Sequence, residues 1–153
     1  MNHHAKIVWN KKSNESFTNG KYSRAHKWYF DEGTEIIASS SPKVVPIPMS
    51  DKSAVDPEEA LIASLSSCHM LFFLSIASLK KYNVELYEDN VEGIMGKNEN
   101  GKIAMLEISL KPKTVFIGTN IPSSNQILKM HQLAHNQCYI SNTINSKINI
   151  HPI

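Results

Sequence analysis

The chain has 153 residues, of which 41% are hydrophobic and 20% charged, and its net charge is +2 with neutral histidines. Those values are typical of one folded domain, so we expect a single domain over residues 1–153 with no attraction to nucleic acid or anionic lipid. The polar N-terminus and the serines that interrupt the apolar stretch 61–79 argue against a signal peptide and a membrane span, so we predict a cytoplasmic protein.

Short strands are predicted in the first part of the chain. Residues 6–9, 26–30 and 34–38 are rich in β-branched and aromatic side chains. Between the last two strands lies a three-residue connection, 31–33, that ends in glycine and is typical of a hairpin. Residues 41–54 contain three prolines, which predict an extended loop.

A long helix is predicted over residues 57–81. Asp56 suits the N-cap, Pro57 suits the first helical position, and Glu59 lies three residues after the cap, as a capping box requires. The apolar residues of this helix are not confined to one stripe, which indicates burial on most sides. In so small a domain, we expect a second subunit to provide part of that burial.

Two long strands, a second helix and a short strand are predicted in the rest of the chain. The strands cover residues 84–97 and 102–116 on either side of a turn, the helix covers 121–138, and the closing strand covers 147–150. This order of elements predicts the α+β class, with helices packed against antiparallel sheet.

The two cysteines, Cys68 and Cys138, are 70 positions apart. Without a secretion signal a structural disulfide is disfavoured, and three alternatives remain: inert core residues, metal ligands or a redox pair. A metal site would use Cys68, Cys138, His135 and one more ligand, with His69 next to Cys68 as the candidate. However, Cys68 and His69 are adjacent on a helix and point about 100° apart, so they cannot easily bind one ion.

A redox thiol needs a nearby cation to form the thiolate, and Arg24 is the candidate because it is the one arginine beside fifteen lysines. The alternative is that Arg24 is an ordinary exposed arginine that lysine could replace. Glu58 is the candidate carboxylate to hold Arg24, although the helix dipole also explains an acid there. Glu58 lies about 15 Å along the helix from Cys68. We therefore predict an isologous homodimer in which a crossing helix closes this gap.

Three segments of the sequence resemble the OsmC/Ohr family (osmotically inducible protein C and organic hydroperoxide resistance protein). Residues 56–70 resemble its first-cysteine helix, 134–142 its second-cysteine motif, and 23–28 the segment that carries the family arginine. The resemblance implies an OsmC-like fold of antiparallel sheets, a long buried central helix and a second helix, in an intertwined homodimer. No cofactor or metal is implied.

The resemblance also implies a two-cysteine peroxidase that reduces organic hydroperoxides, and hydrogen peroxide less well. Cys68 would become a sulfenic acid, and Cys138 would condense with it to form a disulfide. Arg24 would lower the thiol pKa and bind the peroxide, and Glu58 would orient Arg24. A dithiol such as a lipoylated protein would be the reductant. Tyr139 stands where the Ohr branch has proline, so the chain is more similar to a less characterised OsmC-like branch. The alternative is a non-catalytic dimer that binds a hydrophobic ligand or a metal at its interface.

Overall fold

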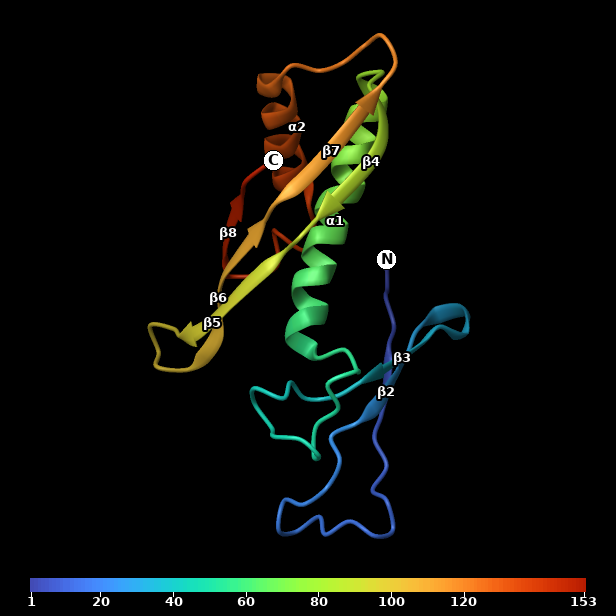
Figure 1. The fold of residues 1–153 in the computed structure, drawn as a ribbon, viewed down its shortest axis with the longest axis vertical. Helices are drawn as coiled ribbons and strands as arrows, with labels where there is room; N and C mark the ends of the chain where they lie inside the picture. Colours follow the sequence, from blue (N-terminus) through green and yellow to red (C-terminus); the bar gives the residue numbers. More distant parts are fainter. The chain divides into compact units, whose positions relative to one another are not determined.

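The computed structural model describes residues 1–153, which form two compact units, Met1–Ala60 and Leu61–Ile153. Each unit has its own strands, and the three sheets do not cross from one unit to the other (Figure 1). Two helices accompany eight strands, so the predicted α+β class is confirmed. A single domain over the whole chain stays a prediction.

The first unit contains a three-stranded antiparallel sheet. Its strands, in their order across the sheet, are β1 (Lys6–Val8), β2 (His26–Tyr29) and β3 (Glu35–Ala38). A 3-10 turn joins β2 to β3, and its Gly33 has a φ of +83°, a left-handed value that glycine adopts without strain. The predicted hairpin and its glycine are therefore confirmed.

Helix α1 (Pro57–Leu79) begins at the predicted N-cap. Oδ1 of Asp56 accepts the N–H of Glu59 at 2.8 Å, and Oε2 of Glu59 accepts the N–H of Asp56 at 3.3 Å, which completes the capping box. The helix ends just before the predicted residue 81, because Lys81 has a φ of 63° and leaves the helical conformation.

The two long strands predicted at 84–97 and 102–116 are each divided in two. The observed strands are β4 (Asn83–Asp89), β5 (Glu92–Lys97), β6 (Ile103–Leu110) and β7 (Pro112–Ile117). They form one long hairpin, because β5 pairs with β6 and β4 with β7, both antiparallel. The prediction of unbroken strands was wrong at Lys111, whose N–H donates to the side-chain oxygen Oδ1 of Asp89 at 2.6 Å and not to a backbone carbonyl oxygen of the opposite strand.

Helix α2 (Ser124–Gln137) and strand β8 (Lys147–Ile150) complete the second unit. A second capping box, between Ser123 and Gln126, starts α2. Strand β8 pairs with β6 in the parallel direction, whereas the sequence predicted antiparallel sheet. The reason is that β7 continues in the direction of β6, and the chain then reverses twice, once before α2 and once after it, so β8 returns in the direction of β6.

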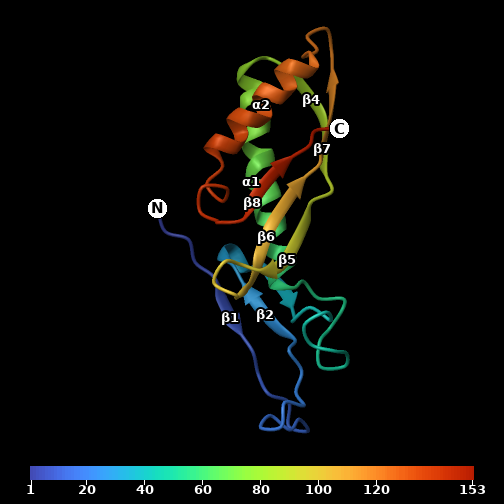
Figure 2. The same ribbon diagram turned by 90° about the vertical axis from the view of Figure 1, so that its left-hand side faces the viewer.

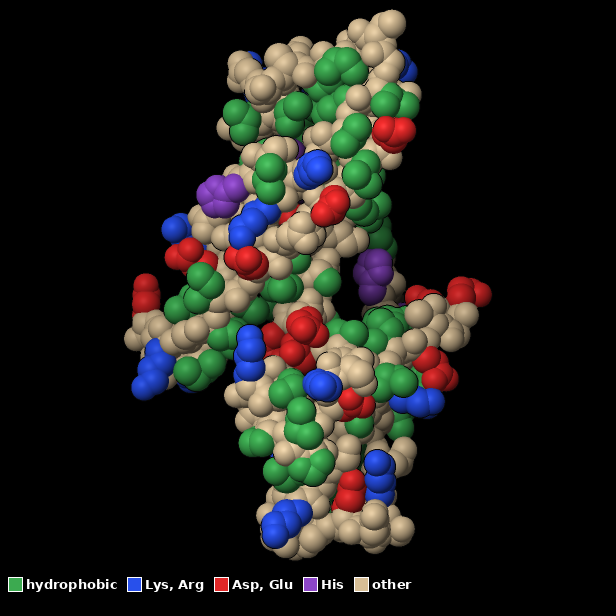
Figure 3. All heavy atoms as spheres, in the orientation of Figure 1, with side chains coloured by type: hydrophobic (Ala, Val, Ile, Leu, Met, Phe, Trp, Pro, Cys, Tyr) green, Lys and Arg blue, Asp and Glu red, His purple; other side chains and the backbone are tan.

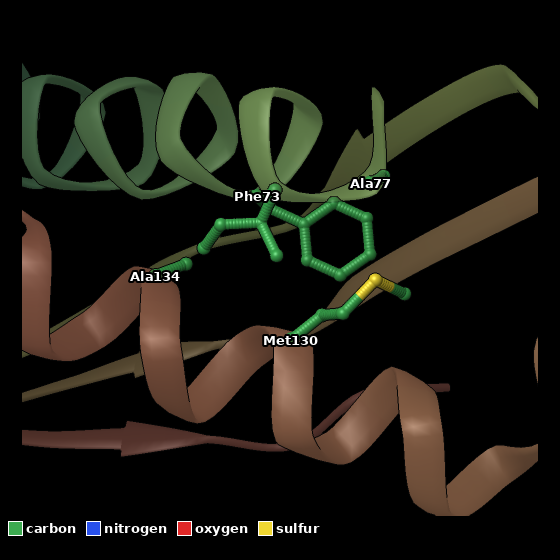
Figure 4. Packing of buried hydrophobic residues seen from close by; sticks show 5 residues of the cluster. Phe73, Ala77, Met130 and Ala134 are labelled. Atoms are coloured by element: carbon green, nitrogen blue, oxygen red, sulfur yellow. The ribbon is translucent and has the colours of Figure 1, made fainter. Parts of the chain in front are cut away.

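Helices α1 and α2 lie side by side against the long hairpin (Figures 1 and 2), and a common core joins them. In Figure 4 the ring of Phe73 on α1 points toward Met130 on α2, with Ala77 and Ala134 on either side. All four residues are fully buried. A second cluster, formed by Leu65, Ile108, Leu110 and Cys138, lies at another level of the same unit. Helix α1, which carries Cys68, is therefore anchored on both α2 and the sheet.

Much of the apolar surface of α1 is exposed within one chain. Leu71 is 61% exposed and Leu79 is 78% exposed. By length and composition alone α1 could cross a membrane, with a mean hydropathy of 1.8 over its most apolar window, but core helices of globular proteins have the same property. The predicted burial on most sides is thus not reached within a single chain.

Acidic and basic side chains are intermixed over the face of the molecule drawn in Figure 3. This mixture agrees with the small net charge of +2. A surface of mixed sign does not produce the strong one-sign field that attracts nucleic acid.

Candidate active site

Cys68 lies in the middle of α1, and its side chain is partly exposed. It lines an open hollow of about 490 Å³. The other lining residues come from one face of α1 and from the segment after α2: Ser64, Ser67, Leu71, Phe72, Ser75, Tyr139 and Ile140. Because most of these side chains are apolar and the serines are small, the Cys68 thiol is accessible to a small apolar molecule.

Tyr139 forms one wall of this hollow. Its ring meets the ring of Phe72 edge to face, with centroids 5.1 Å apart and an interplanar angle of 88°. This geometry is favourable for an aromatic pair. The tyrosine remains 69% exposed. The residue in which the chain departs from the Ohr-branch pattern therefore lines the cavity next to Cys68.

Cys138 is the C-cap of α2 and is fully buried. It belongs to the apolar cluster against which Cys68 packs, and both residues are free thiols. Burial raises the pKa of the Cys138 thiol to about 11, and the neighbouring Cys68 thiol also raises it. The fold therefore brings together two thiols that are far apart in the sequence, one open to a hollow and one enclosed.

Arg24 lies in the first unit, in the segment before β2. Its Nη1 donates to the carbonyl oxygens of Gly20 at 2.8 Å and Tyr22 at 2.6 Å, and its Cζ lies 3.7 Å from the centroid of the Tyr22 ring. Such stacking of a guanidinium on an aromatic face is a cation–π contact. The Nε and Nη2 atoms make no hydrogen bond, so one bidentate edge of the guanidinium is unused within the chain.

Glu58 also lies in the first unit, in the first turn of α1, and is partly exposed. It forms no ion pair with Arg24. The three ion pairs of the chain are elsewhere: Lys27 with Glu35, Lys111 with Glu92 and Lys147 with Glu107. The predicted contact between Glu58 and Arg24 is therefore not made within one chain.

His135, which the sequence suggested as a metal ligand, contacts a hydroxyl group. A hydrogen bond of 2.9 Å joins its Nδ1 to Oγ of Ser141. No group of three or more His, Cys, Asp or Glu side chains is placed to hold a metal ion in residues 1–153. The alternative of a metal site with Cys68, Cys138 and His135 thus has no ligand set in this structure.

Two other histidines form a buried pair that the sequence did not predict. Nε2 of His69 and Nδ1 of His131 are 3.0 Å apart, and the two residues are only 1% and 2% exposed. Burial lowers the pKa of His69 to about 4 and that of His131 to about 3. The spacing of 62 residues between them gives no sign of this contact, which depends on how α1 packs against α2.

The site thus combines an accessible thiol and a buried thiol on an α+β fold. The chain matches the OsmC family, described as OsmC-like protein, over residues 50–152. The protein therefore belongs to the OsmC family, and the predicted resemblance and the OsmC-like fold of the chain are confirmed, whereas the homodimer stays a prediction. The comparison with curated proteins gave no match.

The structure is similar to that of an OsmC-like protein of unknown function from Vibrio cholerae. That chain is 50% identical, with a TM-score of 0.99, and the match covers 100% of this chain and 99% of the other. An organic hydroperoxide resistance protein from Elizabethkingia anophelis is 16% identical with a TM-score of 0.70, covering 99% and 94%. The protein OhrB of Bacillus subtilis, also an organic hydroperoxide resistance protein, is 15% identical with a TM-score of 0.68, covering 98% of each chain. The two more distant similarities show a shared fold.

Sequence reasoning did not identify Ser141 as part of the candidate site. Its backbone N–H donates to Sγ of Cys138 at 3.4 Å, and its hydroxyl contacts His135. The available signal was the spacing, because His135 lies three residues before Cys138 and Ser141 lies three residues after it. This spacing brings the three residues together only if the chain turns sharply after the helix.

Proposed function

We propose that the protein is a thiol-dependent peroxidase that reduces organic hydroperoxides, and hydrogen peroxide less well. The observation that carries this proposal is the position of the Cys68 thiol at an open apolar hollow, with the Cys138 thiol packed in the same cluster. Membership of the OsmC family supports it, as do the names of the structurally similar hydroperoxide resistance proteins.

In the proposed reaction the Cys68 thiolate attacks the terminal oxygen of the hydroperoxide. The O–O bond breaks, the alkoxide takes a proton and leaves as an alcohol, and Cys68 becomes a sulfenic acid. The sulfur of Cys138 then attacks the sulfur of Cys68, a disulfide forms, and the oxygen leaves as water. A dithiol such as a lipoylated protein is the proposed reductant, which restores both thiols by exchange.

Arg24 and Glu58 are proposed to support the first step. A guanidinium beside Cys68 would favour its thiolate and stabilise the developing alkoxide. The unused Nε and Nη2 edge of Arg24 suits a bidentate contact with the carboxylate of Glu58, which would fix the guanidinium in place. Since this contact is not made within one chain, we propose that it forms when two subunits assemble.

We propose that the protein acts as a cytoplasmic homodimer. The exposed apolar residues of α1, such as Leu71, would be covered by the second subunit. An antiparallel crossing of two such helices would bring the start of one helix near the middle of the other. Glu58 and Arg24 of one subunit would then serve Cys68 of its partner.

The peroxidase proposal predicts that free thiols are lost when the reduced protein meets one equivalent of cumene hydroperoxide. Both thiols should disappear together, and peptide mapping should find a disulfide between Cys68 and Cys138 within one chain. A matched sample with cumyl alcohol, which has no O–O bond, should keep both thiols. Survival of both thiols with the hydroperoxide would contradict the proposal and favour a dimer that binds a hydrophobic ligand in the same hollow.

A mixing experiment tests whether the site is shared between subunits. Cys68→Ser and Arg24→Ala protomers should each be inactive alone, but after unfolding and refolding together their heterodimers hold one complete site. Random pairing makes half of the dimers mixed, so about a quarter of wild-type activity should return. If Arg24 acts on Cys68 of its own chain, the mixture should remain inactive.

A further inference from the structure

The segment after α2 folds back onto the sulfur of Cys138. The N–H of Ser141 donates to Sγ of Cys138 at 3.4 Å, and the N–H of Asn142 donates to the carbonyl oxygen of Cys138 at 3.0 Å. The helix itself ends on the cysteine, whose N–H donates to the carbonyl oxygens of Ala134 and His135. The buried sulfur is thus enclosed between the last helical turn and the turn that follows it.

A side-chain hydrogen bond ties these two turns together. It joins Nδ1 of His135, in the last turn of α2, to Oγ of Ser141 at 2.9 Å, and both residues are partly buried. Since the same Ser141 presents its N–H to the Cys138 sulfur, the imidazole indirectly holds that N–H in position. The imidazole of His135 makes no hydrogen bond with the Cys138 sulfur, so its effect on the sulfur passes through Ser141.

The resolving reaction places a specific demand on this segment. Cys138 must attack as a thiolate, and the S–S bond to Cys68 forms as the S–O bond of the sulfenic acid breaks and water leaves. Burial opposes the negative charge on Cys138 and raises its pKa, whereas the backbone N–H groups of Ser141 and Ile140 lower it. A donor fixed against the sulfur therefore favours the charged form on which the reaction depends.

We propose that His135 and Ser141 are positioning residues for the resolving step, which hold the Ser141 N–H against the sulfur of Cys138 while it attacks the sulfenic acid of Cys68. This inference rests on the two-cysteine function proposed above. It assigns His135 a role other than metal binding, and it separates the second chemical step from the first, which uses Cys68 and the hollow around it.

The test is a single-turnover experiment with reduced protein and one equivalent of cumene hydroperoxide. Dimedone traps the sulfenic acid, and mass spectrometry follows the trapped Cys68 and the disulfide over time. In Ser141→Ala and His135→Leu the rate of disulfide formation should fall by about tenfold, the effect of loosening one hydrogen bond to a charged group. The rate of Cys68 oxidation should stay within about twofold of wild type, because neither residue touches the hollow.

Two further variants separate positioning from general damage to the fold. Ser141→Thr keeps the hydroxyl and should restore most of the resolving rate. Thr143→Ala is the matched control, since Thr143 lies in the same turn but bonds the carbonyl oxygen of Tyr139 and not His135. It should resolve at the wild-type rate.

Each possible result bears on the inference. Wild-type resolving rates in both Ser141→Ala and His135→Leu would overturn it and leave the peroxidase proposal intact. An equal loss in Thr143→Ala, or no recovery in Ser141→Thr, would also overturn it, because the effect would then be a general weakening of the turn. If the wild-type protein itself loses no thiols, the proposed function fails, and this inference fails with it.

Discussion

Replacement of Cys68 by serine is expected to abolish peroxide turnover, with a loss of at least about 10³-fold, because a serine hydroxyl is not a nucleophile at neutral pH without a dedicated base. Cys138→Ala is expected to behave differently. Its Cys68 should react with the first equivalent of cumene hydroperoxide at close to the wild-type rate, then remain as a sulfenic acid because no second thiol is adjacent. Peroxide consumption with excess dithiothreitol and the intact mass after one equivalent measure these two outcomes.

The structure explains why the two variants should differ. Cys68 lines the hollow that a substrate can enter, whereas Cys138 is fully buried behind it. Circular dichroism should show both variants folded, and dimedone should label only Cys138→Ala after peroxide. A Cys68→Ser variant that still consumes peroxide catalytically would contradict the assignment of Cys68. Labelling of Cys138 in that variant would reverse the two roles.

Mild acid is expected to destabilise the protein through the buried pair His69 and His131. Their folded-state pKa values, lowered to about 4 and about 3, lie below the ordinary value of 6.5. The unfolded state therefore binds more protons, and the stabilisation present above pH 6.5 is lost progressively as the pH falls toward those values. Between pH 6.5 and pH 4.5 the free energy of unfolding should fall by roughly 2–4 kcal/mol.

The groups around this pair define the expected behaviour. After burial, which is the largest effect, His135 on α2 also lowers the pKa of His69, and Asp89 on β4 raises it. Nε2 of His131 is buried without a hydrogen-bond partner, so a proton on this atom has no bonded acceptor in the folded protein. Protonation inside the folded protein is therefore unfavourable.

Urea unfolding at a series of pH values and one protein concentration measures this effect. The measurements cover pH values from 4.5 to 6.5, because carboxyl groups titrate mainly below pH 4.5. The double variant His69→Met/His131→Met fills a similar volume without titrating. Its free energy of unfolding should lose most of the dependence on pH. The matched control His3→Met/His4→Met replaces two exposed histidines and should keep the pH dependence of the wild type. A wild-type protein with constant stability over the window would contradict the prediction.

Local sequence signals identified most of the elements correctly. The capping box of Asp56 and Glu59 depends on residues three apart, so it can be recognised without any tertiary information, and the helix begins there. The hairpin around Gly33 is local for the same reason. The long strands were less predictable, because the break at Lys111 depends on the side chain of Asp89, 22 residues away.

The sequence by itself determined the α+β class, the family, the helix that carries Cys68 and the end of the second helix near Cys138, because each of these follows from short-range patterns and motifs. Only the tertiary structure decided which groups meet. It placed Cys138 beside Cys68, joined His69 to His131, and turned Ser141 onto the Cys138 sulfur. These contacts depend on how α1 packs against α2 and on the turn that follows α2, and neither the packing nor the turn leaves a periodic signal in the sequence.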